Sequence, residues 1–305
     1  MATIDAVAPA PAARREAAAL VAALVTVTLW GSAFVGIRSA GKELSAGPLA
    51  LGRLLVSCAV LGAVALYRRE PLPARRDLAQ IAVYGVLWLG VYSVALNEAE
   101  HHVDAGTASM LVNIGPILIA VLAGLFLHEG FPRGLFAGCV VAFAGCAVIA
   151  YATTQTGSRS GLGIALCLVA AFAYATAVVL QKPVLARAPS ALQVTWLACV
   201  AGTVACLPFA PALASEAADA SPSALAWTVY LGVAPTAVGF ATWSYALRRT
   251  SAGRMGSVTY LVPPVAILLG WIVLAETPPR LALAGGALCL AGVYVARRGP
   301  LTRRR

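Results

Sequence analysis

A single arginine stands inside a long apolar stretch of this sequence. Arg53 lies about five residues, or roughly 7 to 8 Å, from the start of an apolar run at residues 48–67. A charge in such surroundings is costly and usually faces a cavity or a partner. Its guanidinium could bind a carboxylate through two parallel hydrogen bonds. It could equally snorkel to the end of the run or form a structural ion pair, and the sequence leaves these roles open.

Aromatic side chains form a stripe in another apolar run, at residues 78–97. Tyr84, Trp88 and Tyr92 follow one another at four-residue steps, which places the three rings on one face of a helix. Trp88 lies about 15 Å into that helix. The stripe could line an amphipathic pocket. The alternative is a packing or lipid-facing surface, with Tyr84 and Tyr92 at the membrane interfaces.

Two polar residues each stand three positions before a proline. Asn113 precedes Pro116 and Tyr260 precedes Pro263, and both lie about 12 Å into their apolar runs. Proline frees a backbone carbonyl, so these polar groups could bind a substrate directly. Ser109, one turn from Asn113, extends the same face. Ordinary hydrogen bonds between helices are the alternative. The two prolines themselves are predicted to be structural.

Trp30 is a further candidate for substrate contact. It stands next to Gly31 and Ser32 in the run at 17–37. Small residues there also permit close helix packing, so both interpretations stay open.

Two glutamates are expected to play structural roles. Glu129 and Glu276 each precede by three residues a proline that should occupy the first turn of the next helix. A negative charge there complements the helix dipole. We therefore favour this role over a gating ion pair with Arg133 or Arg280.

A polar cluster follows the run at 78–97. Histidine titrates near physiological pH, so His101 and His102 could serve in proton coupling or in sensing protons. Glu98 is the preferred proton-coupling group because it is closest to the apolar run. Carboxylate and imidazole ligands make a metal site formally possible. The simpler interpretation is a solvated acidic loop, and we predict no bound metal.

Composition indicates which elements position these residues. The chain of 305 residues is 60% hydrophobic and 11% charged, which is typical of a membrane protein. A helix needs about 20 apolar residues to cross a hydrocarbon core of roughly 30 Å. Ten such runs predict an all-α integral membrane protein: 17–37, 48–67, 78–97, 105–127, 133–151, 162–181, 191–210, 224–246, 255–274 and 280–296. The first run could imitate a secretory signal peptide, but it lacks a convincing cleavage site.

The chain repeats itself after 147 residues. An ungapped shift of that length aligns Pro116 with Pro263 and Glu129 with Glu276. The pattern predicts two repeats of five helices each. Because five is odd, the second repeat must enter the membrane from the side opposite to the first.

Lysine and arginine indicate the orientation, because short cytoplasmic loops carry an excess of them. With the N-terminus inside, 17 of the 22 fall in cytoplasmic segments and 4 in outer loops, with Arg53 set aside. The net charge of +10 thus reflects orientation in the bilayer and gives no reason to expect nucleic-acid binding. The predicted parts are a cytoplasmic tail at 1–16, a first repeat at 17–152, an external linker at 153–161, a second repeat at 162–297 and a basic cytoplasmic tail at 298–305.

The sequence lacks the motifs of several other function classes. None of the seven cysteines forms a CxxC pair, and no HExxH, GxSxG or GxxxxGK[ST] motif occurs. We therefore expect no disulfide framework, metal centre, cofactor or ATP hydrolysis. An intramembrane enzyme would need a nucleophile with its base, or paired carboxylates, inside the runs. The ten runs contain no aspartate, so we predict that the chain is not an enzyme.

Several segments resemble the EamA repeat of the drug/metabolite transporter superfamily. They are LWGSAFVGIRSA at 29–40, LALGRLLVSCAVL at 49–61, the segment from AGTASM to GCAVI at 105–149, and the partner segment from SVTYLVPP to AGVYV at 257–295. A duplicated P-x(12)-E-x-x-P-R pattern joins the two halves. The resemblance covers about residues 17–297 and implies a ten-helix carrier that works by alternating access, often an amino-acid exporter. Trp30 and Arg53 match the family's pattern in their segments.

These observations predict a secondary transporter for a small molecule. No carboxylate lies deep in any run, which argues against an antiporter of cationic drugs and protons. One embedded arginine with aromatic and amide neighbours suits a zwitterion or small carboxylate, so we expect export or facilitated movement of amino acids or related metabolites. High alanine and arginine with little lysine is typical of a GC-rich bacterium, whose inner membrane is then the expected location. A nontransport receptor or scaffold is the alternative, and proton coupling and oligomeric state stay open.

Overall fold

The computed structural model describes residues 11–99, 102, 111–153, 161–274 and 280–298, and these residues contain helices and turns without a strand. In chain order the elements are α1 (Pro11–Ala40), α2 (Ala46–Tyr67), α3 (Arg75–Gly85), the π-helix η1 (Val86–Tyr92), α4 (Ser93–Ala99), α6 (Gly115–Phe126), α7 (Arg133–Thr153), α8 (Gly161–Arg187), α9 (Ala191–Cys206), the 3₁₀ helix η2 (Leu207–Phe209), α10 (Ala210–Asp219), α11 (Pro222–Leu231), the π-helix η3 (Gly232–Val238), α12 (Gly239–Arg249), α13 (Ala252–Val258), the 3₁₀ helix η4 (Thr259–Leu261), α14 (Val262–Leu274) and α15 (Arg280–Arg298).

Many of these helices suit a membrane. Within the described residues, seven helical stretches are long and apolar enough to cross one: Glu16–Ile37, Ala46–Tyr67, Arg75–Ala99, Gly161–Arg187, Ala191–Asp219, Pro222–Arg249 and Ala252–Leu269. The other three predicted runs contain the shorter apolar helices Gly115–Phe126, Arg133–Val148 and Leu283–Ala296. A helix bonds its own backbone polar groups, which is why apolar surroundings select it. The predicted all-helical membrane architecture is thereby confirmed in outline.

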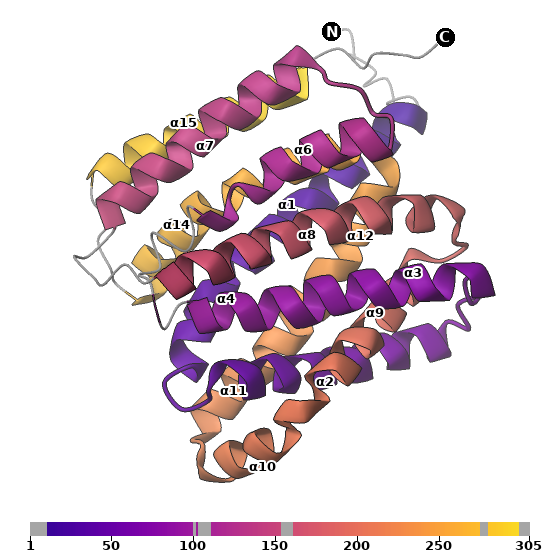
Figure 1. Cartoon of the computed structure of the whole chain (residues 1–305), viewed down its shortest axis with the longest axis vertical. Coiled ribbons are helices and arrows are strands. Elements are labelled where there is room, and N and C mark those ends of the chain that lie inside the picture. Colours follow the sequence, from indigo (N-terminus) through magenta and orange to yellow (C-terminus); the bar gives the residue numbers. More distant parts are fainter. Residues whose placement is uncertain (1–10, 100–101, 103–110, 154–160, 275–279, 299–305) are drawn as a thin grey trace, which may run out of the picture.

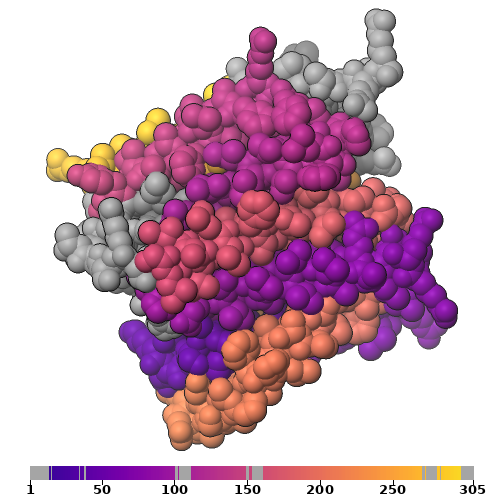
Figure 2. Space-filling view, viewed as in Figure 1, coloured from indigo at the N-terminus to yellow at the C-terminus, as the bar shows by residue number. Residues whose placement is uncertain are grey.

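Figure 1 shows the helices as one bundle, with α7 and α15 side by side at one edge and α10 at the other. We call the end at which α1 begins the proximal end, and the end with the α1–α2 turn at residues 41–45 the distal end. The chain then alternates between the two, and α15 finishes at the proximal end. Figure 2 shows one face of the bundle as closely packed rows of side chains from α7, α8 and α3–α4.

Glycine allows the closest approach, between α7 and α15. A Cβ added at Gly138 would lie 2.4 Å from the backbone nitrogen of Ala296, and one added at Gly292 would lie 2.4 Å from that of Ala142. Only hydrogen fits at such a distance, so the two helices touch backbone to backbone. Since a shift of 147 residues carries α7 onto α15, this contact joins equivalent helices of the two repeats.

The repeats also share their helix interruptions. The π-helices η1 and η3 lie at equivalent positions. Gly85 immediately precedes η1, Gly232 is the first residue of η3, and the two glycines are 147 residues apart. A second pair of interruptions follows: a turn at Asn113 and Ile114 before α6, and η4 before α14. Irregular backbone of this kind is found in membrane proteins where it lines a cavity.

Three helix ends differ from the predicted runs by six residues or more. α1 begins at Pro11 instead of residue 17, since the alanine-rich segment before Leu20 favours helix. α8 continues to Arg187, beyond the predicted end at 181, because its polar last turn is held by neighbouring elements. The seventh run continues past 210 into α10, an amphipathic helix with proline at its start.

Two carboxylates tie the distal turns together. Glu43 accepts hydrogen bonds from the backbone N–H (2.6 Å) and hydroxyl (2.8 Å) of Ser221, at the start of α11. Glu216 accepts the same pair from Ser45, at 2.7 and 2.6 Å, at the start of α2. The hydrogen bonds from Ser221 lower the pKa of Glu43, because they stabilise its charged form.

Candidate substrate site

A cavity of about 150 Å³ lies in the middle of the bundle. Its walls come from both repeats, and it meets the interrupted segments η1, η4 and the turn before α6. The lining residues are Trp30, Ala33, Ile37, Arg53, Trp88, Tyr92, Ser93, Leu96, Asn97, Val112, Asn113, Pro116, Tyr174, Phe240, Thr259, Val262 and Pro263. Five of the eight predicted substrate-binding residues are therefore brought together here: Trp30, Arg53, Trp88, Tyr92 and Asn113.

Arg53 supplies the positive charge of this cavity. Its Nε donates to the hydroxyl oxygen of Thr236 at 3.0 Å. Among the residues that the structure describes, no carboxylate lies within ion-pair distance of Arg53, and its two Nη groups have no hydrogen-bond acceptor. A guanidinium with one edge held and the other open can receive a carboxylate through two N–H donors.

Aromatic rings form one wall of the cavity. Trp88 is at its centre, with ring centroids 5.9 Å from Trp30, 4.9 Å from Phe240 and 5.2 Å from Tyr174. The Trp30 indole N–H donates to the carbonyl of Pro235 at 3.1 Å, which fixes that ring. Such a wall offers rigid apolar area and negative ring faces that attract a cation.

Polar side chains complete the lining of the cavity. The Asn97 amide donates to the carbonyl of Ala46 at 3.0 Å. Thr259 donates to the carbonyl of Gly256 at 2.7 Å and accepts from the Tyr174 hydroxyl at 3.4 Å. The site therefore combines one cation, amide and hydroxyl groups, and an aromatic surface.

A buried polar layer lies on the proximal side of the rings. Trp243 stacks on Trp30 at 5.1 Å and donates its indole N–H to the Gln181 side chain at 3.1 Å. Gln181 donates to Ser244 at 3.0 Å, and Thr195 donates to Ser244 at 2.8 Å. These five side chains come from α1, α8, α9 and α12, so the layer joins both repeats.

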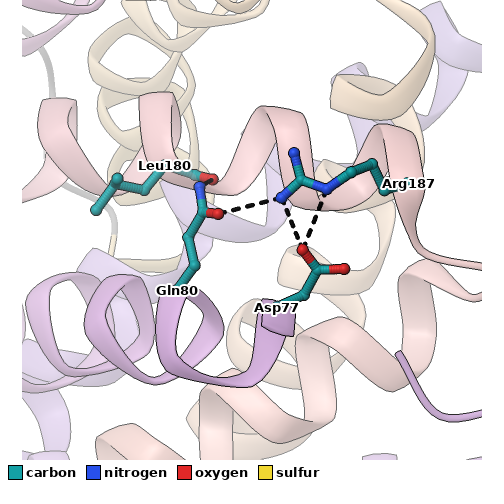
Figure 3. A network of polar contacts seen from close by, with 4 residues as sticks. All are labelled: Asp77, Gln80, Leu180 and Arg187. Atoms are coloured by element: carbon teal, nitrogen blue, oxygen red, sulfur yellow. Dashed lines mark hydrogen bonds and ion pairs between the residues drawn. The ribbon is translucent and has the colours of Figure 1, made fainter. Parts of the chain in front are cut away.

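An ion pair joins α8 to α3 near the proximal end (Figure 3). The Arg187 guanidinium on α8 donates to one Asp77 oxygen on α3, from Nε at 3.1 Å and from Nη2 at 2.7 Å. Nη2 also donates to Gln80 at 3.2 Å, and Gln80 donates to the carbonyl of Leu180 at 2.8 Å. Asp77 is almost fully buried, at 4% side-chain exposure, so α8 and α3 are held together by a partly shielded charge pair.

A second pair of charges holds the turn between α12 and α13. Lys182 donates to the carbonyls of Leu247 and Thr250, both at 2.5 Å. Glu129 accepts from the backbone N–H groups of Ala252 at 2.7 Å and Gly253 at 3.1 Å. Glu129 thus meets a helix N-terminus, but that of α13 in the other repeat and not that of α7, which follows it in the chain.

Two predicted substrate residues lie away from the cavity. Tyr84 is buried and donates its hydroxyl to the carbonyl of Val194 at 3.1 Å, which ties α3 to α9. Tyr260 is fully buried, and its hydroxyl has no hydrogen-bond partner among the residues that the structure describes. Its neighbour Thr259 lines the cavity in its place.

The remaining candidates lie at the distal end of the bundle or outside the described residues. Glu98 and His102 form a contact of 3.2 Å one turn apart, at 50% and 32% side-chain exposure, in keeping with a solvated distal rim. His101, Ser109 and Glu276 lie outside the described residues, as does most of the predicted external linker. The prolines Pro116 and Pro263 both line the cavity.

Sequence reasoning missed Thr236, Tyr174, Phe240 and Trp243. Thr236 follows an intramembrane proline, a signal of the same kind that identified Asn113. Phe240 and Trp243 stand three residues apart, which is an aromatic stripe on a helix. Tyr174 carries no such signal, because its helix is apolar on all sides.

The chain is similar to known transporters over most of its length. It is 41% identical over 284 residues to a "probable terminal-alkyne amino-acid exporter" of Streptantibioticus cattleyicolor, covering 93% of this chain and 95% of that one. It is 26% identical to a "probable amino-acid metabolite efflux pump" of Salmonella typhimurium, covering 92% and 95%. A solved crystal structure covers 95% of this chain and 100% of its own, with a TM-score of 0.77 at 21% identity, which shows a shared fold. The model of the EamA-like transporter family matches residues 17–151 and 161–298. This chain is therefore a membrane transporter, not an enzyme, and belongs to the EamA-like transporter family.

Proposed function

We propose that this transporter is a secondary carrier that exports amino acids or related small carboxylates. In this proposal ten helices span a bacterial inner membrane as two inverted five-helix repeats, and the central cavity is the substrate site. The observation that carries the proposal is Arg53, which lines a cavity with an aromatic wall and is held there through Nε alone among the residues that the structure describes.

The chemistry of the cavity matches the two ends of an amino acid. A carboxylate would receive two charge-assisted hydrogen bonds from Arg53, each worth about 1.5–3 kcal/mol. An apolar side chain would pack on Trp88 and Phe240, and an ammonium would meet ring faces and the amide oxygens of Asn97 or Asn113. The names of the two relatives above both refer to amino acids, which supports this choice of substrate.

Charge supports an orientation with the proximal end in the cytoplasm. Arginines gather there: Arg68, Arg69, Arg75, Arg76, Arg133, Arg187, Arg248, Arg249 and Arg254 all stand at helix ends on that side. The distal end has Arg38, Lys42 and Arg280. Cytoplasmic loops of membrane proteins are enriched in this way, so both termini would be cytoplasmic.

Alternating access would then work on two layers of contacts. In this proposal, Trp243 and its polar partners, and beyond them the Arg187–Asp77 pair, separate the cavity from the cytoplasmic side. The cavity itself is lined by residues near the distal helix ends, such as Ile37 and Asn97. We infer an outward-facing conformation, and release of the proximal contacts would admit substrate from the cytoplasm.

Efflux from proteoliposomes tests this proposal. Purified protein is reconstituted with a panel of labelled amino acids inside, with and without an imposed pH gradient, and empty liposomes are the control. We expect selective efflux of amino acids with apolar side chains. Dependence on the gradient would implicate Glu98, which Glu98→Gln tests. Absence of flux for every amino acid, from protein shown to be folded, would contradict the substrate class.

A further inference from the structure

We infer that Thr236 is the positioning residue of the carboxylate site: it holds the Arg53 guanidinium so that its two Nη groups face the cavity. This inference rests on the proposed function for its consequence in transport. The geometry behind it stands independently, in the contacts of η3 with α2.

A proline creates the acceptor that holds Arg53. Pro235 has no N–H, so it cannot donate to the carbonyl of Leu231, four residues earlier. The Thr236 hydroxyl, five residues on from Leu231, donates to that carbonyl at 2.7 Å. The π-helical spacing of η3 brings residue 236 over it.

The single hydroxyl hydrogen sets the direction of the contact with Arg53. A threonine hydroxyl has one hydrogen to donate and two lone pairs to accept with. Because Leu231 takes the hydrogen, the oxygen meets Arg53 Nε as an acceptor, at 3.0 Å. Arginine only donates, so the two groups are complementary.

Close backbone packing fixes Thr236 relative to Arg53. A Cβ added at Gly232 would lie 2.8 Å from the carbonyl oxygen of Arg53, so η3 rests directly on that turn of α2. Thr236 itself is fully buried. With Nε engaged from a fixed point, the guanidinium has little freedom to turn its Nη edge away, which preserves the open pair of donors.

The contact between Thr236 and Arg53 has no equivalent in the other pair of corresponding positions. At the positions equivalent to Pro235 and Thr236, 147 residues earlier, stand Trp88 and Leu89, and Val200 stands at the equivalent of Arg53. The first-repeat π-helix therefore supplies an aromatic wall residue, and the second supplies the holder of the cation. One duplicated element thus serves two different parts of the same cavity.

The test compares Thr236→Val, which removes the acceptor at nearly constant shape, with Thr236→Ser, which keeps it. Thr228→Val is the matched control: Thr228 is buried one helical segment earlier, and its hydroxyl donates only to the carbonyl of Ala224 in its own helix. We expect Thr236→Val to raise the KM of a transported amino acid about tenfold or more, as loss of a hydrogen bond to a charged group implies. The KM of Thr236→Ser and that of Thr228→Val should both stay close to the wild-type value.

A double variant separates positioning from general damage. Lysine has a methylene carbon where arginine has the Nε–H that donates to Thr236. In an Arg53→Lys background, Thr236→Val should therefore have no further effect on KM. Equal and independent effects in the two backgrounds would overturn the inference. If Arg53→Lys itself leaves KM unchanged, the proposed carboxylate site fails instead.

The position of the guanidinium can also be measured without substrate. In protein labelled with ¹⁵N-arginine, the Nε–H of Arg53, assigned by Arg53→Lys, should exchange slowly with water in the wild type and Thr236→Ser. It should exchange faster in Thr236→Val. Slow exchange that survives Thr236→Val would overturn the inference whatever the protein transports.

Discussion

Replacing Arg187 by alanine removes the guanidinium that joins α8 to α3 at the proximal end. Two of its donors, at 2.7 and 3.1 Å, meet one oxygen of Asp77. The Asp77 side chain is 4% exposed and that of Arg187 is 41% exposed. The variant therefore leaves a carboxylate in a shielded position without its partner.

The magnitude follows from this uneven exposure. Breaking a fully buried pair costs about 3–5 kcal/mol, and an exposed pair contributes about 0.2–1 kcal/mol. Since solvent reaches Arg187 but hardly reaches Asp77, we expect about 1–2 kcal/mol. If the contact exists only while the proximal end is closed, the open population rises roughly 5- to 30-fold.

Hydrogen exchange followed by mass spectrometry measures this change. Amides in the last turns of α8 and the first turn of α3 should exchange faster by that factor in Arg187→Ala. Arg249→Ala is the matched control, because Arg249 stands at the same end but, within the described part of the chain, has its hydrogen bond and its cation–π contact with Tyr245 of its own helix. Asp77→Ala and the double variant complete a cycle. Equal exchange in Arg187→Ala and Arg249→Ala, or additive effects in the cycle, would refute the proposed closing contact.

Three further predictions test the packing, the cavity and the distal turns. Gly292→Ala should lower the melting temperature, because its Cβ would lie 2.4 Å from backbone and overpacking costs about 1–3 kcal/mol, whereas Gly286→Ala on the same helix, with its nearest atom at 3.4 Å, should not; equal melting temperatures would contradict the backbone contact of α7 with α15. Trp88→Phe enlarges the aromatic wall cavity and should raise the preference for larger apolar amino acids over smaller ones roughly tenfold in transport competition, and an unchanged ratio would remove Trp88 from the site. The contacts of Glu43 stabilise the fold above its unfolded pKa of about 4.3 and are lost as the pH falls through its lowered folded pKa, so melting temperature should fall more steeply below about pH 4 in the wild type than in Glu43→Gln; parallel curves would show that the contact with Ser221 contributes nothing.

Much of the architecture was readable from the sequence. Long apolar runs predict helices strongly, and the 147-residue repeat predicted equivalent elements that the structure shows in α7 and α15 and in η1 and η3. Arg53 was identifiable because a charge inside an apolar run is energetically costly and usually faces a cavity or a partner. Asn113 was identifiable from its proline.

The sequence did not reveal how the helix interruptions change the direction in which neighbouring side chains point. Tyr84 and Trp88 share a face of a regular α-helix, but the π-helix η1 begins at Val86, between them, and turns Tyr84 toward α9 while Trp88 lines the cavity. In the same way the tight turn of η4 presents Thr259 to the cavity and Tyr260 to the bundle interior. Both interruptions depend on packing against other helices, which one-dimensional periodicity does not contain.

The position of Glu129 shows a similar limit. The sequence predicted a carboxylate at a helix N-terminus, and the structure has one, but at α13, more than a hundred residues away in the chain. Local spacing identifies the type of contact. The choice of partner is made by the fold, because the loop before α7 and the turn before α13 meet at the proximal end.

Equilibrium binding to Arg53 variants tests the central claim most directly. Isothermal titration of the purified wild type and of Arg53→Met compares an apolar amino acid with the matching amine that lacks the carboxylate. Two charge-assisted hydrogen bonds predict that the wild type binds the amino acid at least about 100-fold more tightly than the amine, and that this ratio falls to about one in Arg53→Met. A preference for the amino acid that survives Arg53→Met would contradict the assignment of the carboxylate to this guanidinium.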